Sequence, residues 1–278
     1  MARETDPIVK AAEAALAARL GESTRVDGSG YCELNSDNLV AGITPEIWAS
    51  ARRDLGKGRG DELTHKFRAA YSSAALAVNA FGPLGGVHVP RIEPVHGRIR
   101  FEQARSAWAR GYWPTLDVIV ETPGAPVRLY VESKCIEYLR KTDTRFSSAF
   151  PRIAREHLEP STADVFEAVH EDRYLFDPVD APQLLKHFLA AKRAAQEHAC
   201  QVILLCVWWE PTNAERWPVF ERHRLRAGDL ARRLGDPDVE LLAMPYPELL
   251  QHWERIGDAA LCEHVAALRS RYDVALDS

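Results

Sequence analysis

Pro114-Thr-Leu-Asp-Val-Ile-Val-Glu121 and Leu129-Tyr-Val-Glu-Ser-Lys134 are the two stretches that decide the fold of this chain. Each is a short apolar run rich in Val, Ile and Leu, which is typical of a buried β-strand. Thr122-Pro-Gly-Ala-Pro126 lies between them and is a strong turn signal. The two runs therefore predict a β-hairpin.

Three charged residues, Asp117, Glu132 and Lys134, lie near the ends of these apolar runs. A turn centred on the Gly-Ala pair places Asp117 opposite Glu132, with Cβ atoms about 5 Å apart. Glu132 and Lys134 share one face of their strand, whereas Ser133 points the other way. Two carboxylates beside an ammonium suit a hard divalent cation such as Mg²⁺. The alternative is an exposed hairpin with ordinary surface charges, but charges among apolar residues are costly to bury without partners.

This pattern of Asp117 followed by Glu132-Ser-Lys134 resembles the motif of the PD-(D/E)XK superfamily, the restriction-endonuclease-like nucleases. Further stretches, over about residues 60 to 210, resemble one bacterial branch of that superfamily. They are Lys66-Phe67, Tyr71–Asn79, Phe81–Leu84, Gly97–Glu102, Val131–Leu139 and Gln183–His187. The resemblance implies an α/β fold in which helices flank a mixed β-sheet core, with N- and C-terminal helical additions.

The resemblance also implies site residues. Asp117 and Glu132 would bind Mg²⁺, or Mn²⁺, with help from the backbone carbonyl of Ser133. Lys134 would orient or help deprotonate the attacking water. The superfamily often adds an acidic residue from the helix before the sheet, and Glu62 is the candidate here. The alternative for Glu62 is a first-turn glutamate that only favours the helix dipole.

The segment after Asp180-Ala-Pro182 predicts a helix with a capped start. Gln183 lies in its first turn, where it would orient the water or Lys134. The alternative for Gln183 is an exposed polar residue at a helix start. This helix leads into Gln201–Trp209, whose continuous apolar pattern predicts a buried strand added parallel to the sheet.

The length of 278 residues is enough to bury the core of one α/β domain. We predict an N-terminal helical extension over residues 1–60, a nuclease-like core over 61–212 and a mostly helical C-terminal part over 213–278. The expected helices cover residues 7–19, 45–55 with Thr44 as N-cap, and about 61–79. The expected strands cover about residues 97–102, 115–121, 127–133 and 239–243.

Composition is ordinary for a soluble globular protein, with 46% hydrophobic and 27% charged residues. No stretch is apolar enough to span a membrane and the N-terminus has no signal-peptide core, so the cytoplasm is the expected compartment. The five cysteines are scattered and form no CxxC pair, which argues against disulfides and a zinc cluster.

The net charge of −5 does not indicate nucleic-acid binding, but a nuclease needs only a local basic path. Two clusters are candidates for such a path. The first is Lys134, Arg140, Lys141, Arg145, Arg152 and Arg155, and the second is Arg222, Arg224, Arg226, Arg232 and Arg233. The alternative for each cluster is a solvated helix face with interleaved acids, which is favoured for the second cluster because only the first adjoins the Glu132-Ser-Lys134 motif.

The resulting hypothesis is a metal-dependent nuclease that hydrolyses phosphodiester bonds, with DNA as the expected partner and a homodimer compatible with double-strand cutting. Restriction, repair and defence roles all fit. Two alternatives stay open. One is a catalytically silent nucleic-acid-binding or structural module of the same fold. The other is a Mg²⁺-dependent hydrolase of a small phosphate ester.

Overall fold

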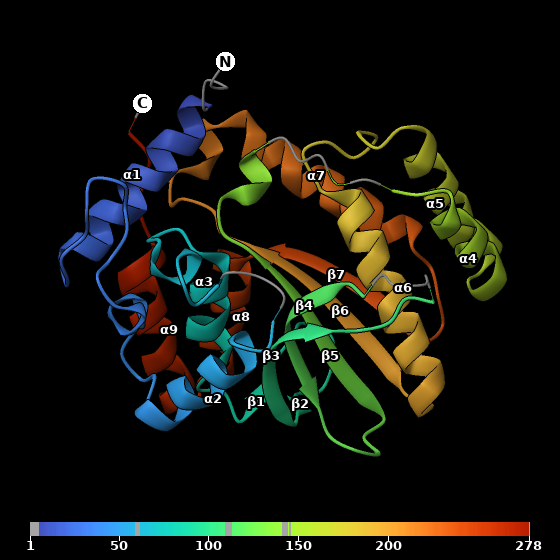
Figure 1. Cartoon of the computed structure of the whole chain (residues 1–278), viewed down its shortest axis with the longest axis horizontal. Coiled ribbons are helices and arrows are strands. Elements are labelled where there is room, and N and C mark those ends of the chain that lie inside the picture. Colours follow the sequence, from blue (N-terminus) through green and yellow to red (C-terminus); the bar gives the residue numbers. More distant parts are fainter. Residues whose placement is uncertain (1–5, 59–61, 109–112, 141–143, 145, 278) are drawn as a thin grey trace.

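A five-stranded sheet forms the centre of the computed structural model, which describes residues 6–58, 62–108, 113–140, 144 and 146–277 (Figure 1). Its strands are β3 (Arg98–Ala104), β4 (Thr115–Glu121), β5 (Val127–Lys134), β6 (Gln201–Trp208) and β7 (Val239–Pro245). They follow one another across the sheet in this order. The first three are antiparallel, whereas β5, β6 and β7 are parallel. The sheet is therefore mixed, and the predicted fold class is confirmed.

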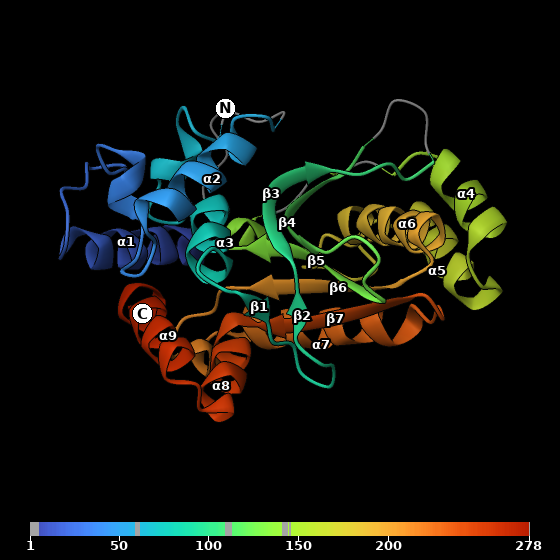
Figure 2. The same ribbon diagram turned by 90° about the horizontal axis from the view of Figure 1, so that it is seen from below.

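Helices cover both faces of this sheet. In the described residues they are α1 (Pro7–Gly21), α2 (Pro45–Leu55), α3 (Ser73–Phe81), α4 (Ala149–His157), α5 (Pro160–Glu171), α6 (Ala181–His198), α7 (Pro218–Arg233), α8 (Tyr246–Ile256) and α9 (Ala259–Tyr272). Figures 1 and 2 show α3, α8 and α9 on one side of the sheet and α4, α5 and α6 on the other. A small hairpin of β1 (Gly86–Val87) and β2 (Val95–His96) completes the fold. No helix in the described segments is long and apolar enough to cross a membrane.

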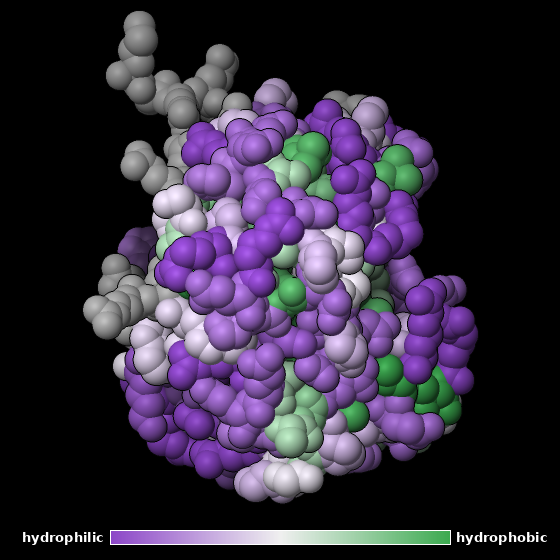
Figure 3. Space-filling model, turned by 90° about the vertical axis from the view of Figure 1, so that its right-hand side faces the viewer, coloured by the Kyte–Doolittle hydropathy of each residue, from purple (hydrophilic) through white to green (hydrophobic). Residues whose placement is uncertain are grey.

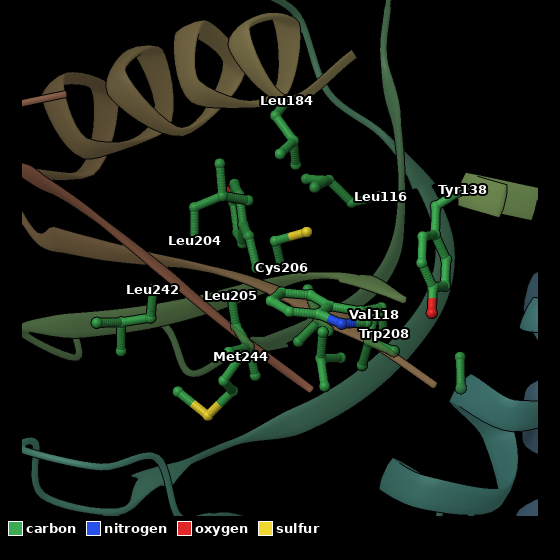
Figure 4. Packing of buried hydrophobic residues seen from close by; sticks show 14 of the residues in the cluster. Leu116, Val118, Tyr138, Leu184, Leu204, Leu205, Cys206, Trp208, Leu242 and Met244 are labelled. Atoms are coloured by element: carbon green, nitrogen blue, oxygen red, sulfur yellow. The ribbon is translucent and has the colours of Figure 1, made fainter. Parts of the chain in front are cut away.

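The β4–β5 hairpin has the register that the turn predicts. Val118 pairs with Val131, and Val120 pairs with Leu129. The apolar side chains of these strands are buried on both faces because helices cover both sides of the sheet. Figure 4 shows one of these packed layers, where Leu184 of α6 points toward Leu116 of β4. The predicted strand after α6 is β6, and it pairs with β5 in the expected parallel direction.

The helix expected over about residues 61–79 is wrong in its first half. Only Ser73–Phe81 is α-helical, and residues 62–72 form turns and a short 3-10 helix, η2 (Lys66–Arg68). The backbone of this segment bonds to a distant segment, since Ala70 N donates to Gly30 O and Cys32 N donates to Arg68 O. Tertiary hydrogen bonds of this kind override local helix propensity. Ser72 then caps α3 by accepting from Ala75 N.

His223 of α7 is a buried histidine whose ring faces two aromatic rings. It is 3% exposed, and its ring centroid lies 4.3 Å from that of Tyr138 and 4.5 Å from that of Trp208. Burial lowers its pKa to about 3, far below the ordinary 6.5. Between these two pH values the unfolded chain binds the proton more readily than the folded protein does. The free energy of unfolding therefore falls as the pH falls through this window.

When the pH is lowered from about 8 to about 5, we expect the protonation of His223 to lower the free energy of unfolding by about 2 kcal/mol. Urea unfolding of the wild-type protein and of His223→Gln at both pH values measures this decrease. The variant should lose less stability on acidification, because the other histidines are present in both proteins. Equal losses would mean that His223 is already protonated when folded.

Candidate active site

Asp117 and the Glu132-Ser-Lys134 stretch lie at the same end of the β4–β5 hairpin, because the two strands run antiparallel. The paired register runs as far as Val118 and Val131, one residue before Asp117 and Glu132 would face each other. There Ser133 N donates to Asp117 Oδ2 over 2.6 Å, so the aspartate side chain continues the contact between the strands. The Ser133 hydroxyl contacts Tyr246 Oη at 2.8 Å, whereas Lys134 Nζ contacts Glu132.

Glu132 is the most deeply buried of the candidate carboxylate ligands named above. It is 1% exposed, and Lys134 Nζ lies 2.6 Å from its Oε1 atom. His187 Nε2 lies 3.1 Å from its Oε2 atom. Burial alone would raise the pKa of Glu132, but its contacts with Lys134 and His187 lower it to about 2. Glu132 is therefore ionised at neutral pH.

Helix α6 supplies two polar side chains from its first turns. Asp180 caps this helix by accepting from Gln183 N. Gln183 Oε1 then accepts from Lys134 Nζ at 3.0 Å, which fixes the direction of the ammonium. His187 is four residues further on, on the same face of the helix. The structure thus brings Gln183 against Lys134 and His187 against Glu132.

The ammonium of Lys134 stays charged in this site. Burial would lower its pKa, but the carboxylates of Glu132, Glu137 and Asp117 raise it above the ordinary value. Asp117 behaves in the opposite way, because burial and the charges of Glu132 and Glu102 raise its pKa well above the usual range. The negative charge of Glu132 is therefore neutralised by Lys134, whereas the charge of an ionised Asp117 is poorly neutralised.

Glu62 lies on a turn rather than on the predicted helix. Its side chain is 16% exposed, and its Oε1 atom lies 3.0 Å from Lys66 Nζ. Burial raises the pKa of Glu102 to about 7, and the negative charges of Glu62 and Glu132 contribute to this shift. Glu62 is therefore close enough to the site to affect its charge, although no helix carries it there.

Glu102 and His187 are two site residues that the sequence patterns do not single out. Glu102 is in β3. The connection from β3 to β4 is too long for the register of this strand pair to be predicted from the sequence. His187 ends the Gln183–His187 stretch that resembles the family, but its position a helical turn after Gln183 does not indicate a contact with Glu132. Both residues are brought to Asp117 and Glu132 by contacts between elements that are far apart in the chain.

The carboxylates of Asp117 and Glu132 are suitable ligands for a hard divalent cation, although their oxygens do not converge on one point. Among the described residues, no group of three or more His, Cys, Asp and Glu side chains is placed to hold a metal ion as it stands. Instead, the ammonium of Lys134 forms an ion pair with one carboxylate oxygen of Glu132, and Ser133 N donates a hydrogen bond to one carboxylate oxygen of Asp117. Carboxylate oxygens are the ligands that Mg²⁺ prefers, and the raised pKa of Asp117 reflects negative charge that a cation would relieve.

Lys134 is the member of the two predicted basic clusters that lies in this site among the residues that the structure describes. Lys141 and Arg145 lie outside the described residues. Most of the others pair with acids: Arg140 with Glu13, Arg152 with Glu156, Arg155 with Asp164 and Glu167, Arg224 with Glu210, and both Arg232 and Arg233 with Asp229. Figure 3 shows the side of the molecule that lies to the right in Figure 1, which is mostly hydrophilic with small separate hydrophobic patches. These arginines favour the interpretation as solvated helix faces.

Comparison with known proteins identifies a family. A family model described as "Restriction Endonuclease associating with ARP" matches residues 28–273, a range that includes every candidate site residue. Comparisons with curated proteins and with solved structures find no match.

Proposed function

Since the chain belongs to the family of restriction endonucleases that associate with ARP, we propose that it is a divalent-metal-dependent nuclease that hydrolyses phosphodiester bonds in DNA. The observation that carries the proposal is the convergence of Asp117, Glu132 and Lys134 at one end of the hairpin, with Gln183 bonded to Lys134. This combination of carboxylates and a fixed cation suits a metal-dependent nuclease, which must position a water and stabilise a phosphate that gains charge.

Asp117, Glu132 and the backbone carbonyl of Ser133 would hold Mg²⁺ or Mn²⁺. When bound, such an ion lowers the pKa of a water and offsets negative charge on the phosphate. A cation on the Glu132 carboxylate would share it with Lys134, whose ammonium lies 2.6 Å from the Oε1 atom.

Lys134 would act as a charged donor toward the attacking water or a phosphate oxygen. Its pKa is raised by the carboxylates around it, so it holds its proton at neutral pH. Donation fits this charge state better than deprotonation of the water does. Gln183 would hold the ammonium in one direction through the hydrogen bond that its Oε1 atom accepts. His187 would restrict the rotation of Glu132 from the other side.

Incubation of the purified protein with linear, circular and single-stranded DNA, with Mg²⁺, with Mn²⁺ and with a chelator, tests this function. We expect cleavage of at least one DNA form with either metal and none with the chelator. The pattern of products separates endonuclease from exonuclease action.

Three results would contradict the proposal, and each would indicate a different function. Cleavage of RNA alone would change the substrate. Retention of DNA without cleavage in any metal would support a binding module of the same fold. Hydrolysis of bis(p-nitrophenyl) phosphate that DNA does not inhibit would support a hydrolase of small phosphate esters.

A further inference from the structure

A cavity of about 740 Å³ lies beyond the carboxyl ends of the parallel strands β5 and β6. Three segments form its walls: η3 (Glu137–Leu139) follows β5, the start of α7 follows β6, and residues 173–179 precede α6. The carboxyl ends of parallel strands are where α/β proteins commonly bind ligands. The volume is in the range of pockets that hold a small molecule.

This cavity adjoins the candidate active site. Lys134 and Gln183 line a smaller cavity, of about 40 Å³, together with Tyr138 and Val179. Tyr138 and Val179 also line the larger cavity, so the two cavities are neighbours. Both of these side chains are buried. A DNA strand that placed a phosphate beside Lys134 would therefore bring an adjacent nucleotide close to the larger cavity.

Three arginines line the larger cavity, and they differ in how far their charges are neutralised. Arg140 pairs with Glu13, and the guanidinium of Arg173 lies 4.6 Å from the centre of the Tyr174 ring. Arg222 is exposed and forms no ion pair with any residue that the structure describes. The charge of Arg222 is therefore the most available to an anion in the cavity.

The start of α7 also favours an anion in this cavity. Its N-cap, Trp217, makes no side-chain hydrogen bond to the first helical turn. Uncapped N–H groups at the start of a helix attract negative charge. Two carboxylates line the cavity as well, but Asp6 is engaged as the N-cap of α1 and Asp177 is exposed to solvent. Helix α7 thus offers an anion both its first turn and Arg222.

The rest of the cavity is apolar and aromatic. Ile8, Leu139 and Val179 contribute buried apolar side chains, and the rings of Tyr174 and Trp217 are partly exposed. Aromatic rings of this kind can stack on a nucleobase of any sequence. A ligand that combines an anion with a flat ring suits such a cavity, and a nucleotide has both.

We propose that this cavity binds one unpaired nucleotide of the DNA strand that the active site cleaves, an inference that rests on the proposed nuclease function. Arg222 and the first turn of α7 bind the phosphate of this nucleotide, and Tyr174 and Trp217 contact its base. A paired base stays stacked between its neighbours, so a nucleotide has to leave the double helix to enter a cavity. The preferred substrate is therefore a single strand or the frayed end of a duplex.

Isothermal titration calorimetry with deoxyadenosine 5′-monophosphate, in chelator, tests this site without any cleavage. We expect the wild-type protein to bind this mononucleotide and Arg222→Gln to bind it about tenfold more weakly. Deoxyadenosine lacks the phosphate, so it should bind both proteins equally. Arg226→Gln is the matched control, because Arg226 is an exposed arginine one turn further along α7 that does not line the cavity. It should bind the mononucleotide as the wild-type protein does.

Competition with DNA distinguishes a nucleotide of the substrate strand from a free nucleotide. A short single-stranded oligodeoxyadenylate should displace the mononucleotide from the wild-type protein. A blunt DNA duplex should displace it poorly, because its bases stay paired. Displacement by neither DNA would mean that the cavity takes free nucleotides only, which would overturn the assignment to the substrate strand. Equal displacement by both would overturn the preference for an unpaired nucleotide.

The outcomes also separate this inference from the proposed function. DNA cleavage by a protein that does not bind the mononucleotide would overturn this site and leave the nuclease function intact. Equal binding by the wild-type protein and Arg222→Gln would overturn the role of Arg222. Binding of the mononucleotide and its displacement by single-stranded DNA, without cleavage in any metal, would support the site and contradict the nuclease function alone.

Thermal unfolding of the variants controls for folding. Arg222→Gln and Arg226→Gln should melt at the wild-type temperature, because both side chains are exposed. Arg222→Lys provides a second test at the same position. It keeps the positive charge, so it should bind the mononucleotide more tightly than Arg222→Gln does. Equal weakness of the two variants would contradict a contact between the charge of Arg222 and the phosphate.

Discussion

Asp117→Asn is expected to lower metal-dependent DNA cleavage by about 10³-fold or more, since a metal ligand supports several kcal/mol of transition-state stabilisation. The amide keeps an oxygen that can accept the hydrogen bond from Ser133 N, so the contact between β4 and β5 is retained. Only the charge is removed. The loss should therefore appear in catalysis and metal affinity rather than in folding.

The same variant should be more stable than the wild-type protein when no metal is present. Burial and the charges of Glu132 and Glu102 raise the pKa of Asp117, which means that its ionised form is unfavourable there. Differential scanning fluorimetry with and without Mg²⁺ measures both effects. We expect Mg²⁺ to raise the melting temperature of the wild-type protein and to have little effect on Asp117→Asn.

Glu240→Gln serves as the control for this comparison, because it changes one strand carboxylate to an amide far from the site. It should retain wild-type cleavage and the wild-type response to Mg²⁺. Full cleavage by Asp117→Asn would show that Asp117 is not a metal ligand in the reaction.

Lys134→Ala is expected to reduce turnover by about 10²–10³-fold, the usual cost of removing one donor that stabilises charge in a transition state. The affinity for DNA should change little, because one side chain contributes a small share of the phosphate contacts. Single-turnover cleavage and a binding titration in Ca²⁺ measure the two quantities separately. Lys134→Arg should recover part of the rate, since it restores a charged donor with different geometry.

The Lys134 variant also has a structural consequence that must be separated from catalysis. Removal of one partner from a buried ion pair costs about 3–5 kcal/mol, because Glu132 is left charged and unpaired. Bound Mg²⁺ should offset much of this cost, so that turnover is best compared in saturating metal. Cleavage at nearly the wild-type rate under these conditions would exclude a role for Lys134 in the reaction.

The hairpin could be predicted because its signals are local. Thr122-Pro-Gly-Ala-Pro126 sets the turn and the turn sets the register, which is enough to place Asp117 and Glu132 at the same end of the two strands. The N-cap at Thr44 and the strand after α6 were predictable for the same reason, since a short sequence pattern is enough to define each of them.

Contacts between distant segments could not be predicted. The first half of the expected helix over 61–79 is lost to backbone bonds with Gly30 and Cys32. Glu102 reaches the site through the β3–β4 register, which depends on the connection between these strands rather than on any local pattern. His187 depends on how α6 packs against the sheet, and its sequence spacing from Gln183 alone does not indicate a contact with Glu132.

The order of the strands in the sheet has a consequence for how the protein folds. Each strand from β4 to β7 pairs with the strand of this sheet that precedes it in the chain, so the sheet can grow at one edge as the chain is synthesised. Asp117, Glu132 and Gln183 have all emerged by the time α6 forms. Helix α9 is synthesised after all of these elements, and its Arg271 bonds to the side chain of Asn38 and the carbonyl of Ala70. The candidate site can therefore take shape on a nascent chain before its two ends meet.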